Sequence, residues 1–125
     1  MRVPLVMRRG DTPLWDVAVT NPDGTPFDLT GYVAYFTAKR SLADADPGVF
    51  QLSIGAGVTV TSAAGGLLAI QPRRADTNAL TEDTRLFVDV QISESGAPDR
   101  TFTVWPSDDD WPGELIIYRD VTRAP

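Results

Sequence analysis

Acidic side chains are the groups in this 125-residue chain whose number and spacing come nearest to chemistry, because it contains no histidine and no cysteine. Histidine is the commonest general base, and both missing residue types are the usual ligands of zinc. The acids are scattered along the chain and nowhere form the defined pair that acid–base catalysis needs. We therefore predict that the protein is not an enzyme and has no catalytic, cofactor or metal site.

One acidic run offers oxygen ligands of the kind that Ca²⁺ prefers. Asp108, Asp109 and Asp110 are consecutive, and Asp44 and Asp46 supply two further carboxylates from an earlier polar segment. Their spacing matches no calcium-binding loop, and consecutive acids on a turn usually form a solvated surface. We expect the solvated surface rather than a calcium site.

A second candidate is the tripeptide Arg9-Gly10-Asp11, which matches an integrin-binding motif. Three residues match by chance in many chains. Glycine and aspartate are also the residues that a turn before a strand requires, because they tolerate the backbone angles of tight turns. We expect the turn, with the binding motif as the alternative.

Tryptophan and proline surround the acidic run. Trp105 precedes Pro106, and Trp111 precedes Pro112. Exposed aromatic rings beside carboxylates can stack on sugars, so a glycan site is one interpretation. The favoured interpretation is packing at the end of the fold, or burial in a subunit interface, where tryptophan is enriched.

Basic residues and overall charge oppose nucleic acid as a partner. Lys39, Arg40, Arg73 and Arg74 form two basic pairs without interleaved aromatic residues, and the net charge of the chain is −6. Nucleic-acid affinity depends largely on neutralising phosphates, and anionic lipid also repels an acidic surface. No apolar run approaches the ~18 residues of a membrane helix, and the basic first nine residues lack a signal-peptide core. We expect a protein made and used without export signals.

The clearest structural pattern is the segment Arg85–Ser93, in which apolar residues occupy every second position. Such alternation predicts a strand with one buried and one solvated face. Similar runs recur between turn residues, and the expected strands are Leu14–Thr20, Tyr32–Lys39, Phe50–Ile54, Val58–Thr61, Leu67–Gln71, Arg85–Ser93, Thr101–Trp105 and Glu114–Arg119. Phe102 and Val104 are expected to face inward, and a single helical turn is expected between Arg74 and Asp83.

This spacing predicts an all-β fold, an immunoglobulin-like antiparallel β-sandwich of about seven to eight strands. We divide the chain into residues 1–9, an N-terminal arm or edge strand, and residues 10–125, the sandwich domain. The two interpretations of residues 1–9 differ in whether the segment joins its own sheet or another molecule.

The order of several short motifs resembles a known family. The motifs run from Arg9-Gly10-Asp11-Thr12 through Asn21–Gly31, Val58-Thr59-Val60, Gly66–Ile70, Ala75–Leu80 and Leu86–Ile92 to Gly113–Ile117 and Asp120–Arg123. This series is similar to the immunoglobulin-like β-sandwich domains of tailed bacteriophages, such as the N-terminal domain of baseplate upper proteins. The resemblance covers nearly the whole chain.

The resemblance implies a bacteriophage virion structural protein of the tail, baseplate, neck or capsid. Its partners would be other virion proteins, in multiple copies within a symmetric assembly formed in the host cytoplasm. Because the chain ends at Pro125 without a fibre segment, we expect a stand-alone accessory subunit. A receptor- or carbohydrate-binding module on the virion is the main alternative, and a hydrolase fragment is the third.

Overall fold

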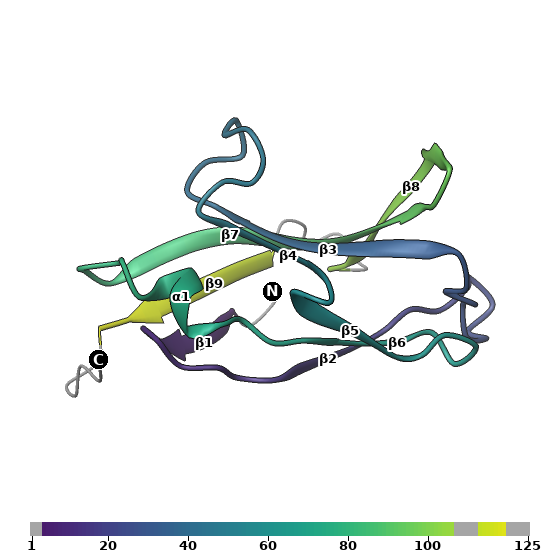
Figure 1. Cartoon of the computed structure of the whole chain (residues 1–125), viewed down its shortest axis with the longest axis horizontal. Helices are drawn as coiled ribbons and strands as arrows, with labels where there is room; N and C mark the ends of the chain where they lie inside the picture. Colours follow the sequence, from purple (N-terminus) through teal and green to yellow (C-terminus); the bar gives the residue numbers. More distant parts are fainter. Residues whose placement is uncertain (1–3, 107–112, 120–125) are drawn as a thin grey trace.

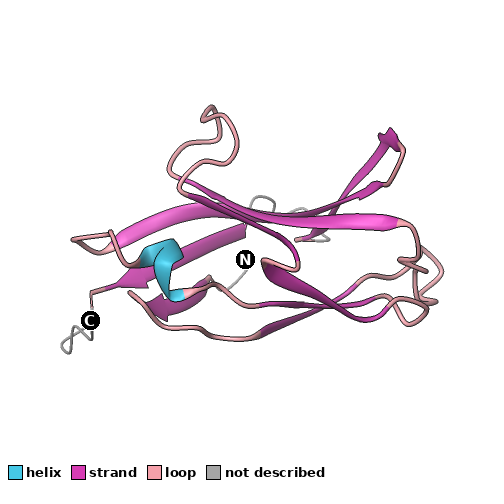
Figure 2. Cartoon of the chain, in the orientation of Figure 1, coloured by secondary structure: helices cyan, strands magenta, loops and turns pink. Residues whose placement is uncertain are grey.

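The computed structural model describes residues 4–106 and 113–119, in which strands are joined by turns and one short helix (Figure 2). The nine strands of this part of the chain are β1 Leu5–Arg8, β2 Trp15–Ala18, β3 Tyr32–Lys39, β4 Phe50–Ile54, β5 Gly57–Ser62, β6 Leu67–Ile70, β7 Thr84–Glu94, β8 Ala97–Trp105 and β9 Gly113–Tyr118. Helix α1 is Arg74–Thr77, where a helical turn was expected. The prediction of an all-β fold is confirmed.

The strands form one curled sheet in the order β1-β9-β7-β3-β4-β5-β6-β2, and β8 also pairs with β7. β3 lies along one edge of β7, while β9 and β8 pair with its first and second halves. Two pairings are parallel, β1 with β9 and β4 with β5, and the others are antiparallel.

The described sheet differs from the expected immunoglobulin-like antiparallel β-sandwich of seven to eight strands, since it is mixed and has nine strands. The physical reason is that a period-two pattern shows which residues form strands, but not which strand each one pairs with. The parallel pairing of β1 with β9 joins the first strand to the last, and no local turn signal announces such a contact.

The curl places β2, β5 and β6 opposite β3 and β7, so that the sheet has an inner and an outer face (Figure 1). β4 and β5 are connected by only two residue pairs, Ser53 with Gly57 and Ile54 with Val58. Gly57 is required at this corner, because a Cβ atom there would lie 2.9 Å from the Leu52 side chain at a φ of +101°.

The inner face holds the hydrophobic core. β7 contributes every second side chain from Leu86 to Ile92, and these inward-facing apolar side chains are all buried: Leu86, Val88, Val90 and Ile92. Phe87, the other apolar residue of this strand, lies on the outer face. Phe36 and Leu52 on β3 and β4 pack in the same core, as do Leu68 and Ile70 on β6. The predicted parity of the Arg85–Ser93 segment is confirmed.

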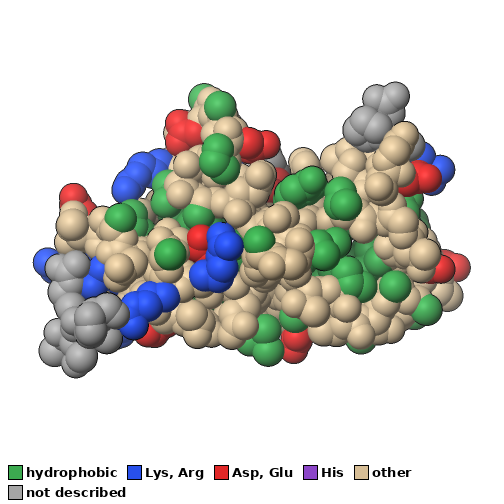
Figure 3. Space-filling model, in the orientation of Figure 1, with side chains coloured by type: hydrophobic (Ala, Val, Ile, Leu, Met, Phe, Trp, Pro, Cys, Tyr) green, Lys and Arg blue, Asp and Glu red, His purple; other side chains and the backbone are tan. Residues whose placement is uncertain are grey.

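Phe102 departs from the expectation of an inward, covered side chain. It lies opposite the buried Ile92 but is 44% exposed. The cause is that β8 rises away from the opposing layer (Figure 1), so that Phe102 is covered on one side by the ring of Phe27, with centroids 6.5 Å apart. Figure 3 shows hydrophobic side chains gathered beneath β8 on this face of the molecule.

Residues 5–8 belong to the same sheet as the rest of the described chain. β1 lies at one end of the strand order and pairs with β9 in the register Leu5 with Leu115 and Met7 with Ile117. Met7 is buried in the core. Of the two interpretations of residues 1–9, the structure has an edge strand at Leu5–Arg8, and residues 1–3 lie outside the described part.

The parity of β7 gives a direct test of the core. We expect Val90→Asp to prevent folding, because an unpaired buried carboxylate costs several kcal/mol against a total stability of about 5–15 kcal/mol. Gln91→Asp, one residue away on the solvated face, should fold with a melting temperature close to that of the unaltered chain. Thermal unfolding followed by circular dichroism measures both, and equal damage from the two substitutions would contradict the inner and outer assignment.

Candidate functional site

Arg9 is a buried charged residue and is 5% exposed. Its backbone N–H donates to the Tyr118 carbonyl oxygen at 2.8 Å, which extends the pairing of β1 with β9. Its guanidinium donates to the backbone and side-chain oxygens of Asn78, the residue at the C-terminal end of α1. The next backbone N–H, of Gly10, donates to the Thr77 hydroxyl at 2.8 Å. These bonds hold the start of the chain, α1 and the end of β9 together.

This geometry decides between the two interpretations of Arg9-Gly10-Asp11. Gly10 has a φ of +79°, and the Asp11 N–H donates to the Arg8 carbonyl oxygen at 3.1 Å, so the segment is a turn. With its guanidinium buried against α1, Arg9 is inaccessible to a receptor. The expectation of a turn is confirmed, and Arg9 has a structural role that the sequence pattern did not indicate.

The proposed calcium ligands do not gather in the described part of the chain. Asp44 accepts a hydrogen bond from the Ser41 N–H at 3.1 Å, and Asp46 forms an ion pair with Lys39 at 2.8 Å. Within residues 4–106 and 113–119, no group of three acidic side chains could hold a metal ion. Asp108, Asp109 and Asp110 lie outside the described residues.

The four basic residues are divided between two elements, β3 with its following loop and α1. Arg73 forms an ion pair with Asp76 at 3.1 Å, and hydrogen bonding to that carboxylate raises the pKa of Arg73. Lys39 is paired with Asp46. Each of these two ion pairs neutralises a basic side chain, so the basic residues do not form the row of uncompensated positive charges that binding to phosphates requires.

Of the two tryptophans beside the acidic run, Trp105 lies in the described part of the chain and Trp111 lies outside it. Trp105 is half-buried and packs against the core, where its ring lies over the backbone of Gly113. The position of Trp105 agrees with the interpretation that it packs at the end of the fold, and not with an exposed ring on which a sugar could stack. Trp111 and Pro112 lie outside the described residues, whereas Pro106 is buried.

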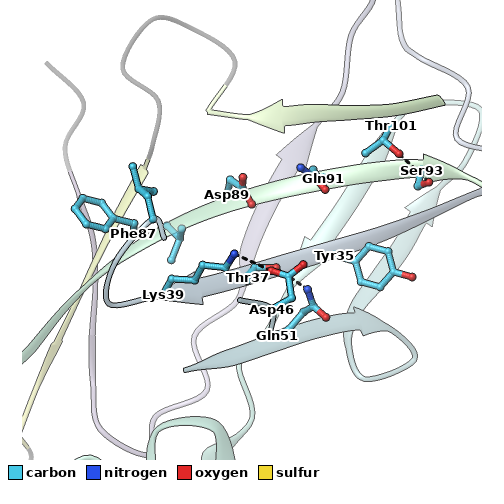
Figure 4. A pocket seen from close by; sticks show the side chains of 12 residues that line it. Tyr35, Thr37, Lys39, Asp46, Gln51, Phe87, Asp89, Gln91, Ser93 and Thr101 are labelled. Atoms are coloured by element: carbon cyan, nitrogen blue, oxygen red, sulfur yellow. Dashed lines mark hydrogen bonds and ion pairs between the residues drawn. The ribbon is translucent and has the colours of Figure 1, made fainter. Parts of the chain in front are cut away.

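A polar groove that sequence reasoning missed lies on the outer face of the sheet. Its floor consists of the side chains of β3, β4 and β7 that point away from the core: Tyr35, Thr37, Gln51, Asp89, Gln91 and Ser93. Strand register sets their neighbours, because Tyr35 lies opposite Gln91 and Thr37 lies opposite both Asp89 and Gln51. Figure 4 shows Asp89, Gln91 and Ser93 in a row along β7, beside Tyr35 and Thr37.

Two projections close the groove at its ends. The loop of residues 40–49 contributes Leu42 and Asp46, and β8 contributes Thr101. Both project from the same side of the sheet (Figure 1), and Figure 3 shows the hollow between them in profile. The groove encloses about 540 Å³, which lies within the usual range of ligand sites, ~300–1,000 Å³.

Internal bonds hold several lining groups in place. Gln51 donates to the Thr37 hydroxyl at 2.9 Å, and Thr101 donates to the Ser93 hydroxyl at 3.1 Å. At one end the ion pair of Lys39 with Asp46 ties the loop to β3. The lining is thus a grid of hydroxyl, amide and carboxylate groups, several of them held by these bonds, with the Tyr35 ring among them (Figure 4).

Such a grid can bind a ligand by hydrogen bonds and ring contacts. The alternation of polar and apolar residues in Tyr32–Lys39 and Arg85–Ser93 is the only sequence pattern that bears on this groove. That signal shows two polar faces but not that they lie side by side.

Comparison with models of known protein families gives no match, and comparison with curated protein sequences gives none either. In the described part of the chain, no helix has the length and apolar character needed to span a membrane.

The buried Arg9 gives a testable consequence. Arg9→Met keeps the stem of the side chain but leaves the Asn78 oxygens without their donor, so we expect a loss of about 1–3 kcal/mol in the free energy of unfolding. The matched control is Arg40→Met, an exposed residue, for which the change should stay within about 0.5 kcal/mol. Denaturant unfolding measures both, and an Arg9→Met protein as stable as the control would contradict the structural role of this residue.

Proposed function

We propose that the chain is a structural subunit of a tailed-bacteriophage virion, built as an immunoglobulin-like sandwich and acting through protein–protein contacts. The ordered series of motifs from Arg9 to Arg123 supports the phage assignment. Known domains of this kind are structural modules, and the proposal needs no catalytic residue.

The thin connection between β4 and β5 supports the sandwich. With only two residue pairs between them, the curled sheet nearly separates into one layer of β1, β9, β7, β3 and β4 and a second layer of β5, β6 and β2. Two mainly antiparallel layers around one core are the arrangement of an immunoglobulin-like sandwich.

The observation that carries the proposal of protein contacts is that four of the seven exposed large apolar side chains of the described residues lie at or beside the two ends of the strand order. Val6, which is 52% exposed, and Tyr118 lie on the terminal pair β1 and β9. Leu14, which is 60% exposed, and Leu67 lie at the other end of the strand order, beside and on the pair β2 and β6. Edge strands offer unpaired backbone groups to a neighbouring chain, and apolar side chains beside them strengthen such pairing.

The proposed partners are other virion proteins, in several copies within a symmetric assembly formed in the host cytoplasm. A net charge of −6 makes the packaged nucleic acid and anionic membranes poor partners. A receptor- or carbohydrate-binding role on the virion is the second candidate, and the polar groove on the outer face is the observation that favours it.

The test is incorporation of the chain into phage particles. Purified virions should contain the chain, and Val6→Glu should reduce its incorporation strongly while leaving its melting temperature unchanged, because Val6 is exposed at an edge. Thr59→Glu, on the outer face of β5 between two paired strands, is the control and should be incorporated normally. Quantitative immunoblotting of gradient-purified particles measures all three proteins.

Leu14→Glu repeats the test at the other end of the strand order. Absence of the unaltered chain from virions would overturn the phage assignment. Normal incorporation of both Val6→Glu and Leu14→Glu would overturn the proposed role of the edges.

A further inference from the structure

We propose that the groove on the outer face of β3, β4 and β7 is a binding site for a neutral oligosaccharide. This inference does not depend on the edge contacts proposed above, because the groove lies on the face of the sheet and its lining residues differ from Val6, Leu14, Leu67 and Tyr118. It rests on the chemistry of the floor, the charge balance and the closed ends.

The floor carries hydrogen-bonding groups that suit vicinal hydroxyls. Gln91 is exposed, and within residues 4–106 and 113–119 no side-chain hydrogen bond holds its amide or the hydroxyl of Tyr35. An amide offers one acceptor oxygen and two donor hydrogens, so the Gln91 side chain can bind two adjacent sugar hydroxyls. Gln91 and Asp89 are successive outward residues of β7, and both line the groove.

An aromatic ring completes the usual composition of a sugar site. Tyr35 lies between Gln91 on β7 and Ser53 on β4, so that its half-buried ring is held within the floor (Figure 4). The C–H face of a pyranose packs on such a ring, while its hydroxyls reach the polar groups alongside. Leu42 and Phe87 add apolar surface toward one end.

The charges in the groove favour a neutral ligand. Lys39, the basic residue of the lining, is paired with Asp46 at 2.8 Å, and Asp89 adds a further carboxylate. An anionic ligand such as a phosphate would find the charge of this lysine already balanced by Asp46. A neutral ligand with many hydroxyls needs no unbalanced cation and can bind through the amide and hydroxyl groups of the floor.

The shape of the groove argues against a peptide bound by strand addition. Most of its floor comes from side chains of β3 and β7, which pair with each other and with further strands on their other sides, so the backbone of these two strands is engaged and does not offer an edge for β-augmentation. The loop of residues 40–49 and β8 bound the length of the site. A volume of about 540 Å³ suits a short oligosaccharide or the end of a longer one.

The experiment exposes the purified full chain to an array of immobilised neutral, sialylated and sulfated oligosaccharides, followed by calorimetric titration of the best neutral one. We expect binding to neutral glycans, a Kd raised at least five-fold in Gln91→Ala, and a similar or larger loss in Tyr35→Ala. Thr59→Ala, on the outer face of the opposite layer, is the matched control and should bind as the unaltered chain does.

Three results would overturn the proposal: no binding to any neutral glycan, binding restricted to acidic glycans, or neutral binding that Gln91→Ala leaves unchanged. Because Gln91 is exposed, its substitution should leave the melting temperature unchanged even where Tyr35→Ala perturbs the fold. Virion incorporation of Gln91→Ala separates this inference from the proposed edge contacts, since we expect this variant to assemble normally.

Discussion

Every second side chain of β7 is buried from Leu86 to Ile92, and β7 is hydrogen-bonded to three other strands, β3, β8 and β9. Because successive side chains of a strand point to opposite faces, this burial also fixes where the intervening residues lie. Phe87, Asp89, Gln91 and Ser93 must then face outward, and they form one side of the groove floor. A shift of one residue in the pairing would place carboxylate and amide groups in the core.

The same constraint links the core to both proposed surfaces. β7 positions β9, β9 positions β1, and Arg9 at the end of β1 anchors the helix that follows β6. The positions of the exposed edge at Val6 and of the groove at Gln91 therefore both depend on the same series of strand pairings. They lie on different parts of the molecule, so an assembled subunit can keep the groove open while its edges contact neighbours.

The amino-acid sequence predicts the strands and their buried sides well, because alternation is local and visible in segments such as Arg85–Ser93. It does not predict the parallel pairing of β1 with β9, which depends on residues more than a hundred positions apart. It places Phe102 on the inner side but cannot show that β8 bends away from its cover. The groove was missed for a similar reason, since it arises only when Tyr35 is placed opposite Gln91. The sequence predicts the turn at Arg9-Gly10-Asp11, but not the burial of the Arg9 side chain, which depends on the distant Asn78.

The most direct measurement of the central claim uses the absence of cysteine from the chain. Single cysteines placed at four successive positions of β7, in Val88→Cys, Asp89→Cys, Val90→Cys and Gln91→Cys, report side-chain accessibility by their rate of reaction with a thiol reagent in the folded state. The account predicts fast labelling at positions 89 and 91, and labelling limited by unfolding at positions 88 and 90. Similar rates at all four positions, or fast labelling at 88 and 90, would contradict it.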